Sequence, residues 1–298
     1  MTKGVKISVI VPTYRRKEEL KRALDSLAEQ SMHDLEIILV DDNDDTLWNE
    51  YVNNIVTNFR KEHTTVNLQY IVNRQNLGSA ASRNAGISAA QGTYITFLDD
   101  DDFYLPDKIK YQYEFMTKNN LDYSITDLAL FYDNGKICEI RQRKFLKKFD
   151  KESLLRYHMM HHLTGTDTMM FTKAYLNKIG AFAQIDVGDE FYLMEKAIQG
   201  GGIFGYLQRC DVKAFVHKGE CGLSSGLRKI NGENDLFEYK KRYFSTFDKR
   251  AIKYIITRHH GVLAFAYMRQ KKLKNFVKEA ILSFSASPID CLRLLFLR

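Results

Sequence analysis

Cysteine and proline are both scarce in this chain of 298 residues, which contains four cysteines and three prolines. The cysteines lie far apart and form no C-x-x-C pair, so the sequence indicates neither a disulfide framework nor a zinc ribbon. With only 17 glycines as well, the chain is neither collagen-like nor dominated by linkers. Its 45% hydrophobic and 27% charged content can support a substantial core. Unpaired cysteines favour a reducing compartment, so we expect a cytoplasmic protein.

Long hydrophobic runs are also missing. The apolar run at 7–11 is too short for the core of a signal peptide and is followed by Pro12. Near the C-terminus the longest such run, 262–268, falls far short of the roughly 20 residues that span a bilayer. The sequence therefore predicts no secretion signal and no transmembrane helix.

The positive charge of the chain belongs to its C-terminal part. The formal net charge is +7, but residues 226–298 hold 16 basic and 6 acidic side chains, a net of +10. Residues 1–225 therefore carry a net charge of −3. A basic, aromatic tail can suit an anionic membrane surface or nucleic acid, or it can be a helical region packed on the rest of the chain.

Predicted strands alternate with predicted helices in the first third of the chain. Apolar and β-branched runs at 7–11, 35–40, 68–72 and 94–98 predict strands, and patterns of period 3.6 between them predict helices. This alternation is typical of an α/β fold with a parallel, doubly wound sheet. Ligands of such sheets bind beyond the carboxyl ends of the strands, so we expect the functional side chains in the loops that follow them.

The middle of the chain predicts further elements of the same sheet, and the end predicts helices alone. We expect a helix up to Lys118, strands at 123–130 and 212–217, and helices at 173–179 and 190–198. Beyond about Gly226 only helical patterning remains. The sequence therefore predicts a catalytic domain at 1–225 and a helical, basic region at 226–298.

Four consecutive aspartates follow the fourth predicted strand, at 99–102. Adjacent carboxylates raise one another's pKa unless a cation neutralises them, and Mg²⁺ or Mn²⁺ prefers such oxygen ligands. A solvated acidic turn is the alternative, but this loop lies at the edge of the sheet where ligands bind. We therefore predict a divalent metal site here.

Four blocks of sequence together carry a family resemblance. They are Val9-Ile-Val-Pro-Thr-Tyr14, Val40-Asp-Asp42, Asn76-Leu-Gly-Ser-Ala-Ala-Ser-Arg-Asn-Ala-Gly86 and Phe97-Leu-Asp-Asp-Asp-Asp102. In this order and spacing the chain resembles family 2 of the GT-A glycosyltransferases over residues 5–220. The resemblance implies a GT-A fold and an inverting, metal-dependent transfer of a sugar from a UDP-sugar.

The resemblance also implies residues that bind the donor. Pro12, Thr13 and Tyr14 match the segment whose aromatic residue lies against uracil, and Asp42 matches the aspartate that accepts a hydrogen bond from uracil. Arg83 matches an arginine that holds a phosphate or organises the acidic loop, with Asn84 and Gly86 supporting its turn.

In the acidic loop, Asp99 matches the position near the ribose, Asp100 stands between, and Asp101 matches the metal ligand. His217 occupies a place where branches of the family use a histidine on the metal or the diphosphate, although a lone histidine after a strand is often an ordinary surface residue.

An acidic pair, Asp189 and Glu190, matches the family's catalytic pair before an apolar helix. The family usually has Glu before Asp, so the order is inverted here. Register against Phe191 and Leu193 places Glu190 at the general base, with Asp189 as the other candidate. A pair of acids opening a helix also has a plain electrostatic explanation, because it complements the helix dipole.

We therefore expect a hexosyltransferase that acts on a glycan acceptor in cell-surface polysaccharide synthesis, with a lipid-linked acceptor suggested by the tail. The tail would either contact the anionic inner face of the cell membrane or pack on the catalytic domain. A sugar nucleotidyltransferase would carry a Gly-rich, basic loop after the first strand, which 12–14 does not provide. A nucleic-acid-binding module would leave the acidic half unused, so we expect no nucleic acid partner.

Overall fold

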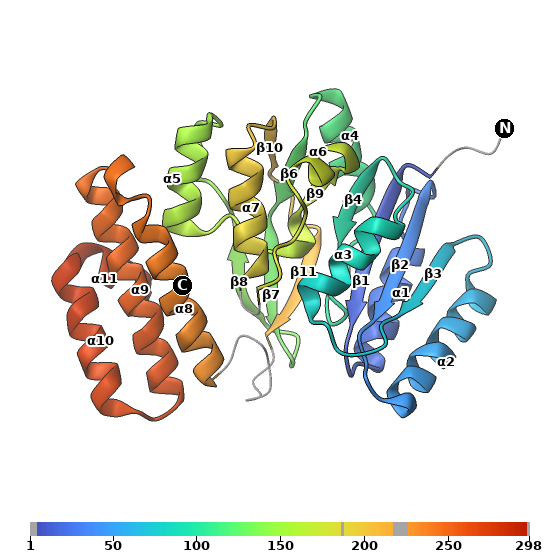
Figure 1. Ribbon diagram of the computed structural model, residues 1–298, viewed down its shortest axis with the longest axis horizontal. Helices are drawn as coiled ribbons and strands as arrows, with labels where there is room; N and C mark the ends of the chain where they lie inside the picture. Colours follow the sequence, from blue (N-terminus) through green and yellow to red (C-terminus); the bar gives the residue numbers. More distant parts are fainter. Residues whose placement is uncertain (1–4, 186–187, 217–225, 297–298) are drawn as a thin grey trace. The chain divides into compact units, whose positions relative to one another are not determined.

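The computed structural model describes residues 5–185, 188–216 and 226–296, and it contains two compact units (Figure 1). The first unit comprises Met1–Phe149, Thr164–Gln184 and Asp189–His217. The second comprises Asp150–Leu163, Ile185–Gly188 and Lys218–Arg298. Each unit is described by itself below.

A seven-stranded sheet forms the centre of the first unit. Its strands, in spatial order, are β10 (Phe204–Leu207), β6 (Tyr123–Thr126), β9 (Met170–Thr172), β4 (Tyr94–Phe97), β1 (Ile7–Thr13), β2 (Leu35–Asp41) and β3 (Asn67–Val72). All neighbouring pairs are parallel except those of β9, which runs antiparallel to β4 and β6. The central strands are apolar along almost their whole length because both faces of the sheet are covered.

Helices lie on both sides of this sheet (Figure 1). They are α1 (Glu18–Ala28), α2 (Thr46–Glu62), α3 (Ser79–Ala89), α4 (Lys108–Lys118), α6 (Lys173–Lys178), α7 (Asp189–Gln199) and the short 3₁₀ helix η1 (Thr166–Thr168). In α1, the leucines Leu20, Leu24 and Leu27 are at most 1% exposed, as their spacing predicts. The prediction of a mostly parallel α/β sheet flanked by helices is confirmed.

A second, four-stranded sheet was not predicted. Its order is β5 (Phe103–Tyr104), β11 (Val212–Val216), β7 (Leu128–Tyr132) and β8 (Ile137–Arg141). The predicted strand at 123–130 is in fact two strands, β6 and β7, which belong to different sheets, and β11 does not extend the first sheet. Between β6 and β7 lies Asp127, whose backbone N–H donates to Arg209 O and whose carboxylate accepts the Tyr206 hydroxyl. These bonds anchor the turn where the chain changes sheets.

The second unit is built from helices, which confirms the predicted helical C-terminal region. It contains α5 (Lys151–His161), α8 (Gly226–Lys241), the 3₁₀ helix η2 (Phe244–Thr246), α9 (Lys249–Arg269), α10 (Leu273–Ala286) and α11 (Pro288–Phe296). Helix α5 was not predicted from the sequence. Among the described residues, no helix combines the length and the hydrophobicity that crossing a bilayer requires.

Candidate active site

Arg83 joins two acidic segments that lie far apart in the sequence. Its Nη2 donates to Asp99 Oδ1 at 2.6 Å, and its Nη1 donates to Asp189 Oδ2 at 2.7 Å. Asp99 follows β4 and Asp189 opens α7, so one guanidinium on α3 holds the acidic loop beside the acidic pair. Three of the residues predicted from the resemblance are thus brought into direct contact.

The side chain of Arg83 is 6% exposed and remains cationic. Burial alone would lower its pKa, but the carboxylates of Asp99 and Asp189 raise the pKa above its ordinary value. The guanidinium also lies over the Phe182 ring, 5.3 Å from its centroid, while Nε has no hydrogen-bond partner. An arginine is suited to this position because its planar fork can meet two carboxylates at once.

The neighbours of Arg83 fix helix α3 in place. The Asn84 amide donates to Phe182 O at 2.9 Å and accepts from Phe182 N at 3.0 Å, which ties α3 to the segment that precedes α7. A Cβ at Gly86 would lie 2.5 Å from Ile10 Cγ2, so this glycine lets α3 approach β1 closely. Gly86 therefore serves packing against the sheet, whereas the resemblance suggested support of the turn.

Asp189 and Glu190 differ in their surroundings, although they are adjacent. Asp189 is engaged by Arg83 and also accepts the Ser79 hydroxyl at 3.3 Å and Glu190 N at 2.9 Å. Burial and the neighbouring Asp189 carboxylate raise the pKa of Glu190 to about 8. Two carboxyl groups with such different environments can have separate tasks, one structural and one in proton transfer.

The loop after β1 is tied to the acidic loop through Asp100. The Asp100 carboxylate accepts the Thr13 hydroxyl at 2.8 Å and Tyr14 N at 3.0 Å. Burial and the negative charge of Asp101 raise the pKa of Asp100 to about 7. Pro12 is partly buried within β1, and Tyr14 is 40% exposed, with the Arg15 guanidinium 5.0 Å from the centroid of its ring.

Asp42 organises the loop that leads into α3. Its carboxylate accepts Asn73 Nδ2 at 2.7 Å, Leu77 N at 2.9 Å and Gly78 N at 2.8 Å. Gly78 has a φ of 84°, a conformation that glycine adopts without strain. The buried Asp42 thus already supports the backbone of this loop, and its predicted contact with uracil would be an additional role.

A carboxylate that was not predicted from the sequence completes the acidic centre. Asp167, in η1, accepts Asp99 N at 2.7 Å, and it forms with Asp99 and Asp102 a group whose oxygens lie within 4.8 Å of one another. Burial and Asp99 raise the pKa of Asp167 to about 7, while burial and Asp167 raise that of Asp102 well above its ordinary range. Such crowding of negative charge and hard oxygen ligands fits a divalent cation.

Asp101, the predicted metal ligand, lies beside this group and is held by an arginine. Its Oδ2 accepts Arg16 Nη2 at 2.7 Å, and its backbone carbonyl accepts Arg22 Nη2 at 2.6 Å. The metal-ligand role of Asp101 therefore stays a prediction. His217, the other predicted ligand, lies outside the described residues.

The residues that were not predicted carry weak signals in the sequence. Asp167 is a lone acid in Thr-Gly-Thr-Asp-Thr, and only its place before the buried strand β9 could have drawn attention to it. The basic residues after Tyr14 are visible in the sequence, but pairing Arg16 with Asp101 requires the fold.

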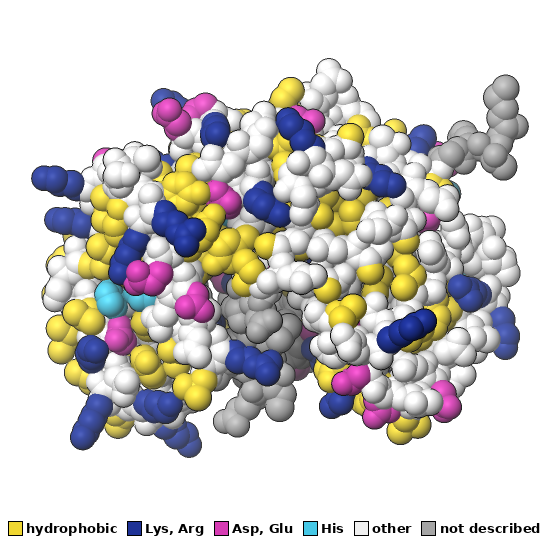
Figure 2. Space-filling view, viewed as in Figure 1, with side chains coloured by type: hydrophobic (Ala, Val, Ile, Leu, Met, Phe, Trp, Pro, Cys, Tyr) yellow, Lys and Arg dark blue, Asp and Glu magenta, His cyan; other side chains and the backbone are white. Residues whose placement is uncertain are grey.

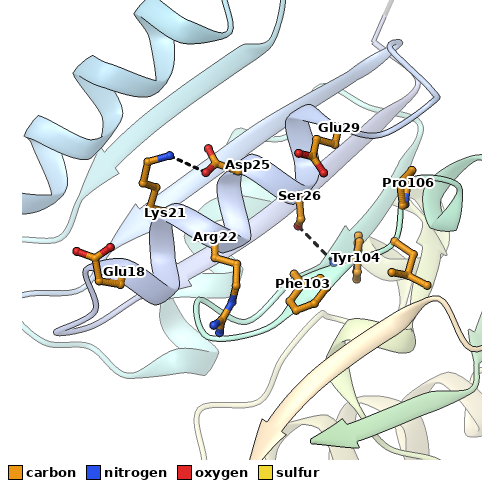
Figure 3. Close-up of a pocket in the computed structure, with 10 residues that line it drawn as sticks. Glu18, Lys21, Arg22, Asp25, Ser26, Glu29, Phe103, Tyr104 and Pro106 are labelled. Atoms are coloured by element: carbon orange, nitrogen blue, oxygen red, sulfur yellow. Dashed lines mark hydrogen bonds and ion pairs between the residues drawn. The ribbon is translucent and has the colours of Figure 1, made fainter. Parts of the chain in front are cut away.

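A pocket of about 420 Å³ lies between α1 and the segment after the acidic loop (Figure 3). Its lining includes Arg22, whose guanidinium reaches the acidic loop, and Asp25, which is paired with Lys21 at 2.6 Å. None of the predicted site residues lines this pocket. The carboxylates and Arg83 therefore define the candidate site, and the pocket flanks it.

Comparison with known proteins identifies a family for this arrangement. The model of the family described as "Glycosyl transferase family 2" matches residues 8–177. A relative from Campylobacter jejuni, named GalNAc(5)-diNAcBac-PP-undecaprenol beta-1,3-glucosyltransferase, is 33% identical over 175 residues, which are 57% of this chain and 53% of that protein. The matched segments span between 19% and 60% of seven related glycosyltransferases.

Solved structures with the same fold include S. aureus TarS 1-349 in complex with UDP-GlcNAc, with a TM-score of 0.61 and 21% identity. That similarity covers 94% of this chain and 91% of the other. A mannosyltransferase from Pyrobaculum calidifontis, in complex with GDP-Man and Mn²⁺, has a TM-score of 0.59 at 15% identity and covers 100% and 89%. The predicted GT-A fold is thereby confirmed.

Proposed function

The chain belongs to glycosyl transferase family 2, and we propose that it is an inverting enzyme that transfers a sugar from a UDP-sugar to a hydroxyl of a glycan acceptor. The observation that carries this proposal is the double ion pair of Arg83, which joins the acidic loop at Asp99 to the acidic pair at Asp189. We place the reaction in residues 1–225.

The proposed reaction is a single displacement. The acceptor oxygen attacks the anomeric carbon, the bond from that carbon to the diphosphate oxygen breaks, and UDP leaves from the opposite face. Glu190 accepts the proton of the acceptor hydroxyl and so acts as the general base. The raised pKa of Glu190 supports this role, because a carboxylate with a higher pKa is a stronger base toward the acceptor hydroxyl once it is ionised. A direct displacement needs no nucleophile from the enzyme.

Asp189 would act as a positioning residue for this base. Its ion pair with Arg83 fixes the start of α7, and its carboxylate accepts Glu190 N. Register against the family's acidic pair assigns Glu190 as the base and leaves Asp189 as the alternative. Turnover of Asp189→Asn against Glu190→Gln separates the two assignments.

The donor would lie along the carboxyl ends of β1, β2 and β4. The exposed ring of Tyr14 would stack on uracil, with Pro12 and Thr13 shaping that wall. Asp42 accepts three hydrogen bonds, and because a carboxylate can accept about four, the uracil N–H would be the fourth donor. Arg83 and Asp100 would support the diphosphate and ribose indirectly, by holding the acidic loop.

A divalent cation, Mn²⁺ or Mg²⁺, would bind among the acidic residues and stabilise negative charge on the departing diphosphate. Asp99, Asp102 and Asp167 form one candidate ligand set. In the alternative set, Asp101 would exchange Arg16 for the cation, and His217 would complete the shell.

For the acceptor we propose a glycan carried on a lipid, in cell-surface polysaccharide synthesis at the inner face of the cell membrane. The supporting facts are the undecaprenol-linked substrate in the name of the Campylobacter jejuni relative and the basic region 226–298. The donor is tested first. We expect hydrolysis or transfer with UDP-sugars, stimulated by Mn²⁺ or Mg²⁺, in a panel that also holds GDP- and dTDP-sugars. Turnover of the latter two alone would overturn the proposed donor.

A further inference from the structure

Helix α10 turns its polar side inward. The side chains of Glu279 and Ser283 are buried, at 8% and 1% exposure. Glu279 pairs with His260 Nδ1 at 2.7 Å, and the Ser283 hydroxyl donates to Thr257 O at 2.8 Å, so both contact α9. Two polar side chains therefore help to attach α10 to α9, beside the partly buried Phe276 and Ala280.

Four large apolar residues of α10 form a stripe that faces solvent. Leu273, Val277, Ile281 and Phe284 are 68%, 50%, 59% and 50% exposed. Their spacing of four, four and three residues places them on one side of the helix, as a continuous stripe. A helix of a globular protein normally buries such a stripe, so this orientation is the reverse of the usual one.

Helix α11 continues the exposed apolar surface. Ile289, Leu292 and Leu295 are 65%, 46% and 51% exposed. Cys291, on another side of α11, is buried and contacts the Ser283 hydroxyl at 3.4 Å. We call these seven residues, four of α10 and three of α11, the apolar face.

Basic side chains accompany this face. Lys274 and Lys278 each follow a residue of the stripe and are exposed, and Lys271 and Lys272 are exposed at the start of α10. Of the two acidic residues in 271–296, Glu279 is buried, and Asp290 lies 3.5 Å from Arg293. Figure 2 shows apolar and basic side chains interspersed on the helical unit.

We propose that α10 and α11 form a docking surface for an anionic lipid bilayer, with the apolar face entering the headgroup boundary and the lysines contacting anionic headgroups. Apolar area and basic charge together are what holds an interfacial helix on such a surface. A protein partner or a second copy of the chain would need no excess of lysine, which is why the charge pattern favours lipid. The docking surface is inferred from exposure and charge alone. Its purpose, access to a lipid-linked acceptor, rests on the proposed function.

Two variants of the full chain test the surface. Val277→Ser/Ile281→Ser/Phe284→Ser removes the centre of the stripe, and Lys274→Glu/Lys278→Glu reverses the charge beside it. The matched control is Ile137→Ser/Ile140→Ser, which changes two residues of β8 that are 58% and 51% exposed. All the substituted side chains are exposed, so the fold should be retained, and unfolding midpoints would verify this.

Flotation is measured with vesicles of phosphatidylcholine alone and with vesicles containing about one third phosphatidylglycerol. We expect the native chain and the control to bind the anionic vesicles, and salt to weaken binding. The lysine variant should lose at least about tenfold in affinity for the anionic vesicles, and the serine variant should no longer bind them. No preference of the native chain for anionic vesicles would overturn the proposal.

Sedimentation velocity tests whether a second copy of the chain covers the apolar face instead. A native dimer that the serine variant dissociates, without vesicle binding, would show that a second copy covers the apolar face. Because neither measurement needs a sugar donor, failure of the docking surface and failure of the proposed transferase activity are distinguishable.

Discussion

Replacing Glu190 by glutamine should stabilise the protein and inactivate it. The pKa of Glu190 is about 8, against an ordinary value of 4.5 in the unfolded chain. Between these values the folded state binds more protons, so the free energy of unfolding falls as pH rises, by up to about 1.4 kcal/mol for each pH unit. The full pKa difference would lower the free energy of unfolding by about 5 kcal/mol at pH 8. Because Glu190 is only partly buried, solvent screening reduces the expected loss to about 2 kcal/mol. Glutamine carries no charge and avoids this loss.

The assay compares unfolding midpoints of the native chain and Glu190→Gln at pH 5, 6.5 and 8. The two should nearly coincide at pH 5, and at pH 8 the variant should melt about 4–8 °C higher. Turnover of the variant should be lower by roughly 10²–10⁴-fold, because it lacks the base. The control is Glu114→Gln, which replaces an exposed glutamate of α4. Its unfolding midpoint should depend on pH as that of the native chain does. Equal pH slopes for the native chain and Glu190→Gln would refute the reasoning.

Two further predictions concern the acidic centre and Arg83. If Asp99, Asp102 and Asp167 hold the cation, Asp167→Asn should weaken the Mn²⁺-dependent part of UDP affinity by about 10–100-fold, as measured by calorimetry. A larger loss in Asp101→Asn would favour the ligand set predicted from the resemblance. Arg83→Met should cost about 3–5 kcal/mol of unfolding free energy by leaving two carboxylates without their cation, and an unchanged unfolding midpoint would contradict the bridging role.

Five of the seven strands of the first sheet are predictable from the sequence because they depend on local patterns, whereas β9 and β10 were not predicted. Continuous apolar runs identify buried parallel strands, and the rule that ligands bind at their carboxyl ends places Asp42 and the acidic loop at one edge of the sheet. The pairing of Arg83 with Asp99 and Asp189 is not deducible in the same way. It joins residues 16 and 106 positions apart, and only the packing of α3 and α7 brings them together.

For a related reason, two single residues, Asp127 and Asp167, were not predicted to matter. The run Tyr123 to Tyr132 has strand composition throughout, and nothing local shows that Asp127 ends one strand and begins another in a different sheet. Asp167 likewise has no motif around it, since its importance comes from the carboxylates it meets. Local pattern describes how a segment folds, whereas the identity of its neighbours follows from the tertiary arrangement.

Helix α10 shows the same limit on the scale of a whole helix. The alternation of lysines with Leu273, Val277 and Ile281 indicates an amphipathic helix, and this much is local. Amphipathicity does not say which side is buried, and for a helix packed on a domain the apolar side is the usual one. Here the position is decided by Glu279 and Ser283, which find partners on α9 that the sequence pattern cannot reveal. Because these two polar groups lie on the inner side of α10, the stripe faces outward, and the polar contacts of the helical unit contribute to the surface that it would present to a membrane.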